Sequence, residues 1–269
     1  MIKTLEKVVT ECGWLARNLR ATPMDEQDKV EQLGAHFSTR VDRESQALGL
    51  RILHEAFPGE IVVAEEQENE TVIPADCTVF DPLDGTTNYF NGIHNGGVTL
   101  CTLCAHQPTY SATSFLSGEP LITAIRGQGC YRGGFSHGRQ IRSIPWHGQL
   151  DKTQFATDIG SWCLNQGTFD TVLRPLAERF NILSSMAAVE GARKVLLGQV
   201  GAYYNFGIAK IWDAAGMALA IQEAGGVVCD PHGNPLRWDT VNCDWIMAGN
   251  QQLADIILEH SRHWPGRKG

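Results

Sequence analysis

The sequence has no apolar run close to the roughly 18 residues that a membrane-spanning helix needs. It also has no excess of positive charge, because 22 Lys and Arg residues stand against 30 Asp and Glu residues, for a formal net charge of −8. A general nucleic-acid binder normally carries a basic face, so neither a nucleic-acid partner nor a membrane is expected. A phosphorylated small molecule remains a possible ligand, since a bound cation can invert the local charge.

Several common signatures are also missing. The segment 1–7 lacks an apolar signal core, and the eight cysteines are scattered through 269 residues, which predicts reduced thiols and a cytoplasmic protein. The chain has no Gly-x-Ser-x-Gly nucleophile motif and no dinucleotide-binding fingerprint. The pair Cys101-x-x-Cys104 lies in an alternating segment without a second pair that would complete a zinc site, so a core strand is the favoured interpretation.

The segment 81–88, Asp-Pro-Leu-Asp-Gly-Thr-Thr-Asn, is the most informative stretch. It follows the β-branched and aromatic residues 78–80, and Pro82 is expected to end that strand at Asp81. Asp81 and Asp84 would repel each other unless a cation lay between them, and oxygen ligands suit Mg²⁺ or Mn²⁺. Residues 85–88 open a predicted helix whose free N–H groups bind phosphate. An ordinary surface turn is the alternative.

Apolar periodicity predicts the remaining elements. Helices are expected at residues 2–19, about 43–56, 168–179 with an interruption at Pro175, 187–198, 213–223 and 251–259. Strands are expected at residues 61–63, 78–80, 97–105, 110–116, 121–124, 127–131, 153–159, 200–204 and 227–229. Residues 21–36 have no period and are predicted to form a loop, and residues 37–42 to form a short strand that runs into a helix. Asp213 is predicted to be the N-cap of its helix.

Three motifs together resemble the inositol monophosphatase family, a group of Mg-dependent, lithium-sensitive phosphatases. They are Ala64-Glu65-Glu66, the segment 81–88 and the segment 212–216, Trp-Asp-Ala-Ala-Gly. Fructose-1,6-bisphosphatases and bisphosphate nucleotidases are relatives of this family. The resemblance covers roughly residues 37–245. It implies an α/β (α+β) fold, a layered αβαβα sandwich of the inositol monophosphatase/fructose-1,6-bisphosphatase type.

The resemblance also implies a domain organisation. The polar stretch 138–152 divides one continuous phosphatase domain into two halves. An α+β half at residues 1–145 would carry the metal site, and an α/β half at residues 146–269 would complete it. A homodimer is the expected assembly.

The resemblance implies a set of metal ligands. Glu65, Asp81 and the backbone carbonyl of Leu83 would hold one Mg²⁺, and Asp81, Asp84 and Asp213 a second, with two or three ions per site and Mn²⁺ as a possible substitute. Gly85 and Thr86 would bind phosphate through their N–H groups.

Catalytic roles follow from the same resemblance. Thr86 would orient the attacking water, with Asp42 behind its hydroxyl and Glu65 as the base. The substrate would contact Asp84, Gly85, Thr86, Asn205 and Asp213.

The substrate region departs from the family pattern. Asn205 follows the Tyr-Tyr pair where inositol phosphatases usually carry a Glu, and Asn is uncharged. Ser185-Met186 stands where a Gly-Ser or Gly-Thr pair is common, and Ala35-His36 replaces a Lys-Asp signature. These departures make phosphate-monoester hydrolysis a firmer expectation than any particular substrate.

The expected function is therefore Mg-dependent hydrolysis of a small-metabolite phosphate monoester, such as an inositol, sugar or polyol phosphate, by metal-activated water. The alternatives are a 3′(2′),5′-bisphosphate nucleotidase, a fructose-1,6-bisphosphatase or a histidinol-phosphatase. For the nucleotidase, Arg193, Lys194 and Lys210 could meet a second phosphate, although a solvated face is the simpler interpretation. A regulatory or binding member of the family without turnover is the alternative from a different class.

Overall fold

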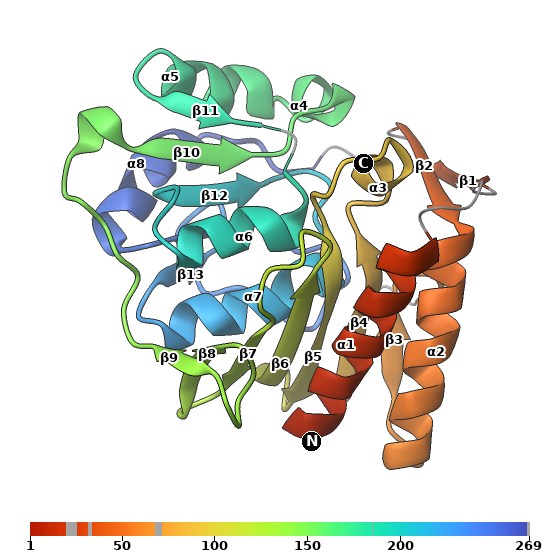
Figure 1. The fold of residues 1–269 in the computed structure, drawn as a ribbon. Helices are drawn as coiled ribbons and strands as arrows, with labels where there is room; N and C mark the ends of the chain where they lie inside the picture. Colours follow the sequence, from red (N-terminus) through yellow and green to blue (C-terminus); the bar gives the residue numbers. More distant parts are fainter. Residues whose placement is uncertain (20–25, 32–33, 68–71, 185, 268–269) are drawn as a thin grey trace.

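Five layers build the molecule, in the order helix, sheet, helix, sheet, helix (Figure 1). The structure is a computed structural model and describes residues 1–19, 26–31, 34–67, 72–184 and 186–267; residues 26–31, 34–37 and 161–162 are described by their backbone alone. The layered α/β sandwich expected from the sequence is confirmed. No helix in the described residues is both long enough and apolar enough to cross a membrane.

The first sheet has seven strands in the order β3-β4-β5-β6-β7-β8-β9. All neighbours pair antiparallel except β3 and β4, which are parallel. The strands are β3 (Val62–Ala64), β4 (Cys77–Asp84), β5 (Gly97–Cys104), β6 (Gln107–Phe115), β7 (Ile122–Ile125), β8 (Gly129–Arg132) and β9 (Arg139–Ile141).

Helices α1 (Ile2–Leu19) and α2 (Arg40–Ala56) cover one face of this sheet (Figure 1). The apolar side of α1, with Leu5, Val8 and Val9, packs with Ile52 and Leu53 of α2 on the sheet. The predicted helix at residues 2–19 is confirmed. The helix predicted to begin near residue 43 begins three residues earlier, because Thr39 caps it.

The loop predicted for residues 21–36 is wrong for its described part. Residues 26–31 form β1 (Glu26–Glu31), which pairs antiparallel with β2 (Gly34–Thr39). Main-chain hydrogen bonds between two strands need no apolar alternation, so the sequence pattern gave no sign of them. The predicted continuation from a strand into a helix at residues 37–42 is confirmed.

The second sheet has five strands in the order β11-β10-β12-β14-β13. Strands β11, β10 and β12 run parallel, whereas β14 pairs antiparallel with both β12 and β13. The strands are β10 (Gln154–Thr157), β11 (Asn181–Leu183), β12 (Ala202–Asn205), β13 (Val227–Cys229) and β14 (Trp245–Ala248). Strands β9, β11 and β14 were not predicted.

Helices α6 (Ala188–Leu196) and α7 (Ile211–Glu223) lie between the two sheets and bury the largest core (Figure 1). Gly216 permits the close approach of α7 to the first sheet, since a Cβ there would lie 2.4 Å from Thr99 Oγ1. The last layer, on the far face of the second sheet, includes α8 (Gln251–Ser261). The short segments are α3 (Thr86–Phe90), α4 (Ser161–Asn165), α5 (Arg174–Ala177), the 3₁₀ turn Leu150–Lys152 and the π-helical turn Phe169–Leu173.

Candidate metal centre

Asp81 and Asp84 both lie on β4, the strand predicted to stop at Asp81. That prediction is wrong: β4 continues to Asp84, but its register against β5 shifts between the two acids, from Asp81 opposite Thr99 to Asp84 opposite Gly97. Residues three apart on a regular strand point to opposite faces, and one extra residue at a bulge removes this difference. Pro82, which has no N–H group to donate, lies inside the bulge. The bulge therefore brings both carboxylates to one side.

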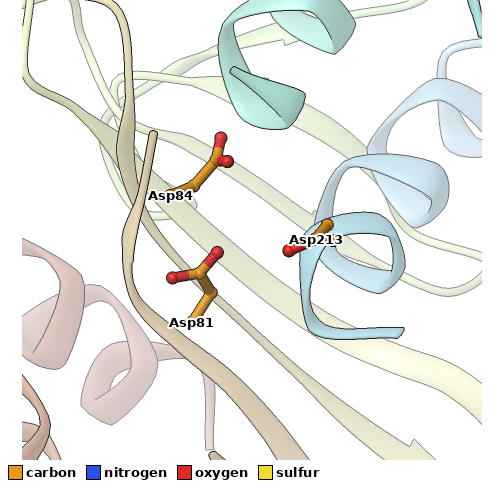
Figure 2. A group of neighbouring side chains, drawn as sticks. All are labelled: Asp81, Asp84 and Asp213. Carbon is orange, nitrogen blue, oxygen red and sulfur yellow. The ribbon is translucent and has the colours of Figure 1, made fainter. Parts of the chain in front are cut away.

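Asp213 comes from α7, on the opposite side of the site from β4 (Figure 2). The prediction that Asp213 is the N-cap is wrong, because the N-cap is Lys210 and Asp213 is the third residue of the helix. Its Oδ2 accepts a hydrogen bond of 2.7 Å from the Lys210 N–H. This bond satisfies one of the free donors at the helix start and fixes the carboxylate toward the first sheet.

The three carboxylates of Asp81, Asp84 and Asp213 converge, with one oxygen of each within 4.8 Å of the others (Figure 2). Burial, and then the neighbouring acids, raise the pKa of Asp81 well above its ordinary value. Burial, foremost, raises the pKa of Asp84 and of Asp213 to about 7. Three buried acids in such close contact carry charge that a cation would neutralise.

One oxygen of Asp81 provides a direct test of whether a metal fits. Its Oδ1 accepts from the Leu83 N–H at 2.9 Å, but its Oδ2 is buried and has no hydrogen-bond partner among the described residues. A buried carboxylate oxygen without a partner is costly. A hard divalent cation would satisfy this oxygen, and the all-oxygen donor set is the one that Mg²⁺ prefers. The residues present therefore fit the ion.

Asp84 is also bound to the start of α6. Its Oδ2 accepts from the Val189 N–H at 2.7 Å, and the Ala188 N–H helps to counter the effect of burial on its pKa. The N-cap residue of α6 is Ala187, whose side chain cannot cap, so Asp84 supplies the missing acceptor. Sequence reasoning missed this contact, because 105 residues separate Asp84 from Val189 and no local motif marks the pairing.

Glu65 lies beside this cluster but is not one of its three converging members. Strands β3 and β4 pair in parallel with Ala64 opposite Phe80, so Glu65 follows β3 at the level of Asp81. The Glu65 N–H donates to the Phe80 carbonyl at 3.1 Å. The charge of Glu65 contributes to the raised pKa values of Asp81 and Asp84.

Thr86 and Asp42 form a second pair at the site. The Thr86 hydroxyl donates to Asp42 Oδ1 at 2.8 Å, and the carbonyl of buried Leu83 lies 3.2 Å from the same hydroxyl. Asp42 is fully buried as the third residue of α2, and its other oxygen accepts from the Thr39 N–H at 2.7 Å. Burial raises the pKa of Asp42, while bonds from Thr39 and Thr86 oppose the rise.

Gly85 occupies the N-cap position of α3 with a φ of 85°, a left-handed conformation that favours glycine. A Cβ at Gly85 would lie 2.7 Å from the Asn95 carbonyl oxygen, so the turn has no room for a side chain. The turn places the N–H groups of Gly85 and Thr86 just after Asp84, and the first N–H groups of a helix lack partners within it.

The predicted substrate residue Asn205 ends β12, across the site from β4. Its side chain is 7% exposed, and its Oδ1 has no hydrogen-bond partner in the described part of the chain. Met186 is buried, and its carbonyl accepts a 2.7 Å bond from the Tyr203 hydroxyl. Ser185 lies outside the described residues, as do the side chains of Ala35 and His36.

Two of the three basic residues considered for a second phosphate, Arg193 and Lys210, have other contacts. Arg193 is buried and pairs with Glu190 at 2.7 Å. The Lys210 ammonium lies 3.2 Å from Asn242 Oδ1. The Arg193 guanidinium in particular pairs with an acid of its own helix, α6, rather than with a ligand.

Asp158 is a further acid at the site that the sequence did not single out. It follows β10, and its charge contributes to the raised pKa of Asp84. The available signal was its position inside the predicted strand at residues 153–159, since an acid at the carboxyl end of a parallel strand often faces a ligand.

All eight cysteines are free in the structure. Cys101 is buried in β5 and Cys104 is exposed at its end, as the core-strand interpretation requires. The candidate metal ligands that converge in the described part of the chain are therefore acids rather than thiols.

Comparison with known proteins gives matches over nearly the whole chain. The inositol monophosphatase family matches residues 1–264. Inositol monophosphatase 2 of Mus musculus is 26% identical over 252 residues, which cover 89% of this chain and 83% of that protein. Nus factor SuhB of Escherichia coli strain K12 is 28% identical over 256 residues, which cover 92% of this chain and 91% of that protein.

The fold likeness extends to solved structures. An IMPase/NADP phosphatase complexed with Mg²⁺ and phosphate matches with a TM-score of 0.80 at 19% identity, covering 100% of this chain and 98% of that one. At 19% identity, this match shows a similar fold and no more. The family match over residues 1–264 includes all three acids. The chain belongs to the inositol monophosphatase family.

Proposed function

We propose that this protein is a Mg²⁺-dependent phosphatase that hydrolyses the phosphate monoester of a small metabolite. The observation that carries the proposal is the cluster of Asp81, Asp84 and Asp213, with its unsatisfied buried oxygen, beside the Thr86–Asp42 pair. Family membership supports phosphatase chemistry and metal binding. The fold relative solved with Mg²⁺ and phosphate supports the same pairing of ion and ligand.

The proposal includes two sets of ligands, which the family resemblance implies. Glu65, Asp81 and the Leu83 carbonyl would hold one ion, and Asp81, Asp84 and Asp213 a second. Bound Mg²⁺ lowers the pKa of water and screens the charge of a phosphoryl group. Asp81 belongs to both sets, which fits its position between Glu65 and Asp213 and the strong effect of its neighbours on its pKa.

Thr86 orients the attacking water in this proposal. The single hydroxyl proton of Thr86 points to Asp42, so the oxygen lone pairs are left to accept a hydrogen bond from water. Asp42 keeps this orientation because it is fully buried and held by Thr39 on its other oxygen. Glu65, at the level of Asp81, is the group that would take the proton from that water.

The backbone of Gly85 and Thr86 would bind the phosphate oxygens. The left-handed turn at Gly85 brings these N–H groups next to Asp84 without a side chain in the way. Backbone donors fixed in advance stabilise the charge that spreads over a phosphoryl group during transfer. Phosphate binding and metal binding would thus share one end of β4.

The test is phosphate release from a panel of monoesters, with and without Mg²⁺, using the wild-type protein and the variant Asp213→Asn. The panel holds inositol 1-phosphate, fructose 1,6-bisphosphate, adenosine 3′,5′-bisphosphate, histidinol phosphate and several sugar phosphates. We expect turnover that needs both Mg²⁺ and Asp213. If folded wild-type protein that binds Mg²⁺ released phosphate from none of them, the proposal would fail in favour of a regulatory role. One relative carries the name of a Nus factor, which makes that role the leading rival.

A further inference from the structure

Asp158 and Asn205 stand side by side at the metal-facing end of the second sheet. Strands β10 and β12 are parallel neighbours with Thr157 opposite Tyr204, so the next residue of each strand lies at the same level. Neighbouring strands are about 4.8 Å apart. An acid and an amide therefore end two adjacent strands at one edge, the usual place for ligand contacts in parallel sheets.

Both side chains belong to the inner face of that sheet. Ala156 and Tyr203 pack in the core between the two sheets, whereas Phe155 and Tyr204 pack on the opposite side, against α8. Because side chains alternate along a strand, the residue two places after Ala156 and the residue two places after Tyr203 return to the inner face. These residues are Asp158 and Asn205.

At the ends of β10 and β12, the inner face of the second sheet lies next to the metal centre. After burial, the charges of Asp158, Asp84 and Asp213 are the causes that raise the pKa of the Tyr203 hydroxyl. That hydroxyl bonds to the carbonyl of Met186, two residues before the helix that binds Asp84. Asp158 therefore shares one space with the acids that would hold the metal and the phosphate.

In the described part of the chain, Asp158 has no cationic partner and the Oδ1 of Asn205 has no hydrogen-bond donor. Asp158 accepts from the Ile159 N–H at 3.0 Å, and in the described part of the chain no Lys, Arg or His forms an ion pair with it. Burial raises the pKa of Asp158 to about 6, and no cation opposes the rise. Asn205, more than nine-tenths buried, has an Oδ1 without a partner among the described residues. Both side chains therefore need a hydrogen-bond donor, and the Asp158 carboxylate needs a donor that carries a positive charge.

We propose that Asp158 and Asn205 select the organic half of the substrate, and that they select a phosphate monoester carrying a protonated amine. An ammonium group has three donors and no acceptor, so it can satisfy both oxygens and neutralise the acid. A hydroxyl group has one proton and no charge, so it could satisfy only one of them. This inference rests on the proposed phosphatase function and deepens it.

The test compares matched substrates that differ in one group. Ethanolamine phosphate, 3-aminopropyl phosphate and 4-aminobutyl phosphate are each paired with the hydroxyl analogue of the same length. We expect the wild-type kcat/KM to favour the best amine over its hydroxyl partner by about 10- to 100-fold, as a charge-assisted hydrogen bond provides. Asp158→Asn, which keeps the shape and removes the charge, should abolish that preference while hydroxyl substrates are still hydrolysed.

A matched control and a binding measurement complete the experiment. Asp151→Asn makes the same change at an exposed acid and should keep the amine preference. Calorimetry with 3-aminopropylphosphonate and 3-hydroxypropylphosphonate, in the presence of Mg²⁺, measures the preference without turnover. Asn205→Ala should weaken binding of the aminophosphonate more than that of its hydroxyl partner.

Three results would overturn the inference and leave the phosphatase proposal standing. The first is equal kcat/KM for amine and hydroxyl substrates in the wild-type protein. The second is an amine preference that survives in Asp158→Asn. The third is a Mg²⁺ requirement that changes equally for all substrates in that variant, since Asp158 would then act on the metal rather than on the amine. Absence of phosphate release from any monoester, by contrast, would count against the proposed function itself.

Discussion

At the scale of single residues, Asp81 lies in an unfavourable electrostatic environment. It is almost fully buried, one oxygen lacks a hydrogen-bond partner among the described residues, and three neighbouring acids repel it. A residue that destabilises the metal-free fold in this way is explained by a task that the fold alone does not require. Binding a cation is the task that fits these contacts.

Changing Asp81 to Asn should separate activity from stability. We expect the kcat of Asp81→Asn to fall at least about 100-fold, because a metal ion contributes several kcal/mol to transition-state stabilisation. The melting temperature of the metal-free variant should stay equal to that of the wild-type protein or rise, since a buried repulsive charge is removed. Activity assays and calorimetry check both points, and a fully active, Mg²⁺-requiring variant would refute the ligand assignment.

Thr86 offers a test of the water-orienting role. Thr86→Ser keeps the hydroxyl and its bond to Asp42, whereas Thr86→Val keeps the shape and loses both. We expect Thr86→Ser to stay within about tenfold of the wild-type kcat and Thr86→Val to lose about 100-fold or more, in the range of general-base contributions. Steady-state kinetics with the best substrate give the comparison, and equal losses in the two variants would argue for a packing role.

At the scale of elements, α6 joins the site to the sheet behind it. Asp84 accepts from the N–H at the start of this helix, and Glu190 in its first turn pairs with Arg193 at 2.7 Å. Glu190 also accepts from the Ser117 hydroxyl at 2.8 Å, while the Arg193 guanidinium lies 5.4 Å from the centre of the Phe115 ring. The helix that binds a metal-site acid thus packs against the first sheet through both members of a buried ion pair that lies within the helix.

Removing the acid of this pair should destabilise the protein strongly. Glu190→Ala leaves the buried charge of Arg193 without its main partner, and we expect a loss of about 3 kcal/mol in the free energy of unfolding. Asp170→Ala breaks the exposed pair of Asp170 with Arg174 and should cost less than about 1 kcal/mol. Chemical denaturation of both variants measures the two losses, and similar values would show that the buried pair has no special role.

At the scale of the whole molecule, the site depends on both sheets and the helices between them. Asp81 and Asp84 come from the first sheet, Asp213 from the middle helix layer, and Asn205 and Asp158 from the end of the second sheet. A ligand that binds this arrangement binds only the folded chain, so it must stabilise the fold as a unit. The repulsion among the acids must weaken the metal-free fold at the pH where they ionise.

The stability of the metal-free protein should therefore fall as the pH rises. Carboxyls of the unfolded chain titrate near 4, whereas Asp84 and Asp213 titrate near 7 in the fold, so between these values the folded protein binds more protons. With EDTA present, we expect the melting temperature to drop by several degrees between pH 5.5 and pH 7.5. The drop should be smaller in Asp213→Asn, and Mg²⁺ at pH 7.5 should reverse it in the wild-type protein. A melting temperature independent of Mg²⁺ would contradict the metal centre.

Local patterns in the sequence were sufficient to predict many of the helices and strands of the chain. Apolar periodicity was sufficient to predict the helix at residues 2–19 and the antiparallel pair β5 and β6. The buried face of such an element can be recognised from the spacing of its own apolar side chains. The three acidic motifs, dense and in order, were sufficient for the family and its layered fold. The departures at Asn205 and Met186 were also visible, since they are differences in residue type.

Only the tertiary structure decided how the acids meet. The bulge that turns Asp84 to the side of Asp81 depends on pairing with β5, and the position of Asp213 depends on where α7 begins. Asp84 binds the start of α6 across 105 residues, and Asp158 lies at the level of Asn205 because their two strands are in register. A contact between distant segments produces no periodic pattern in the sequence of either segment. The sequence by itself therefore supplied the acids, whereas packing and strand register determined which of them share a site.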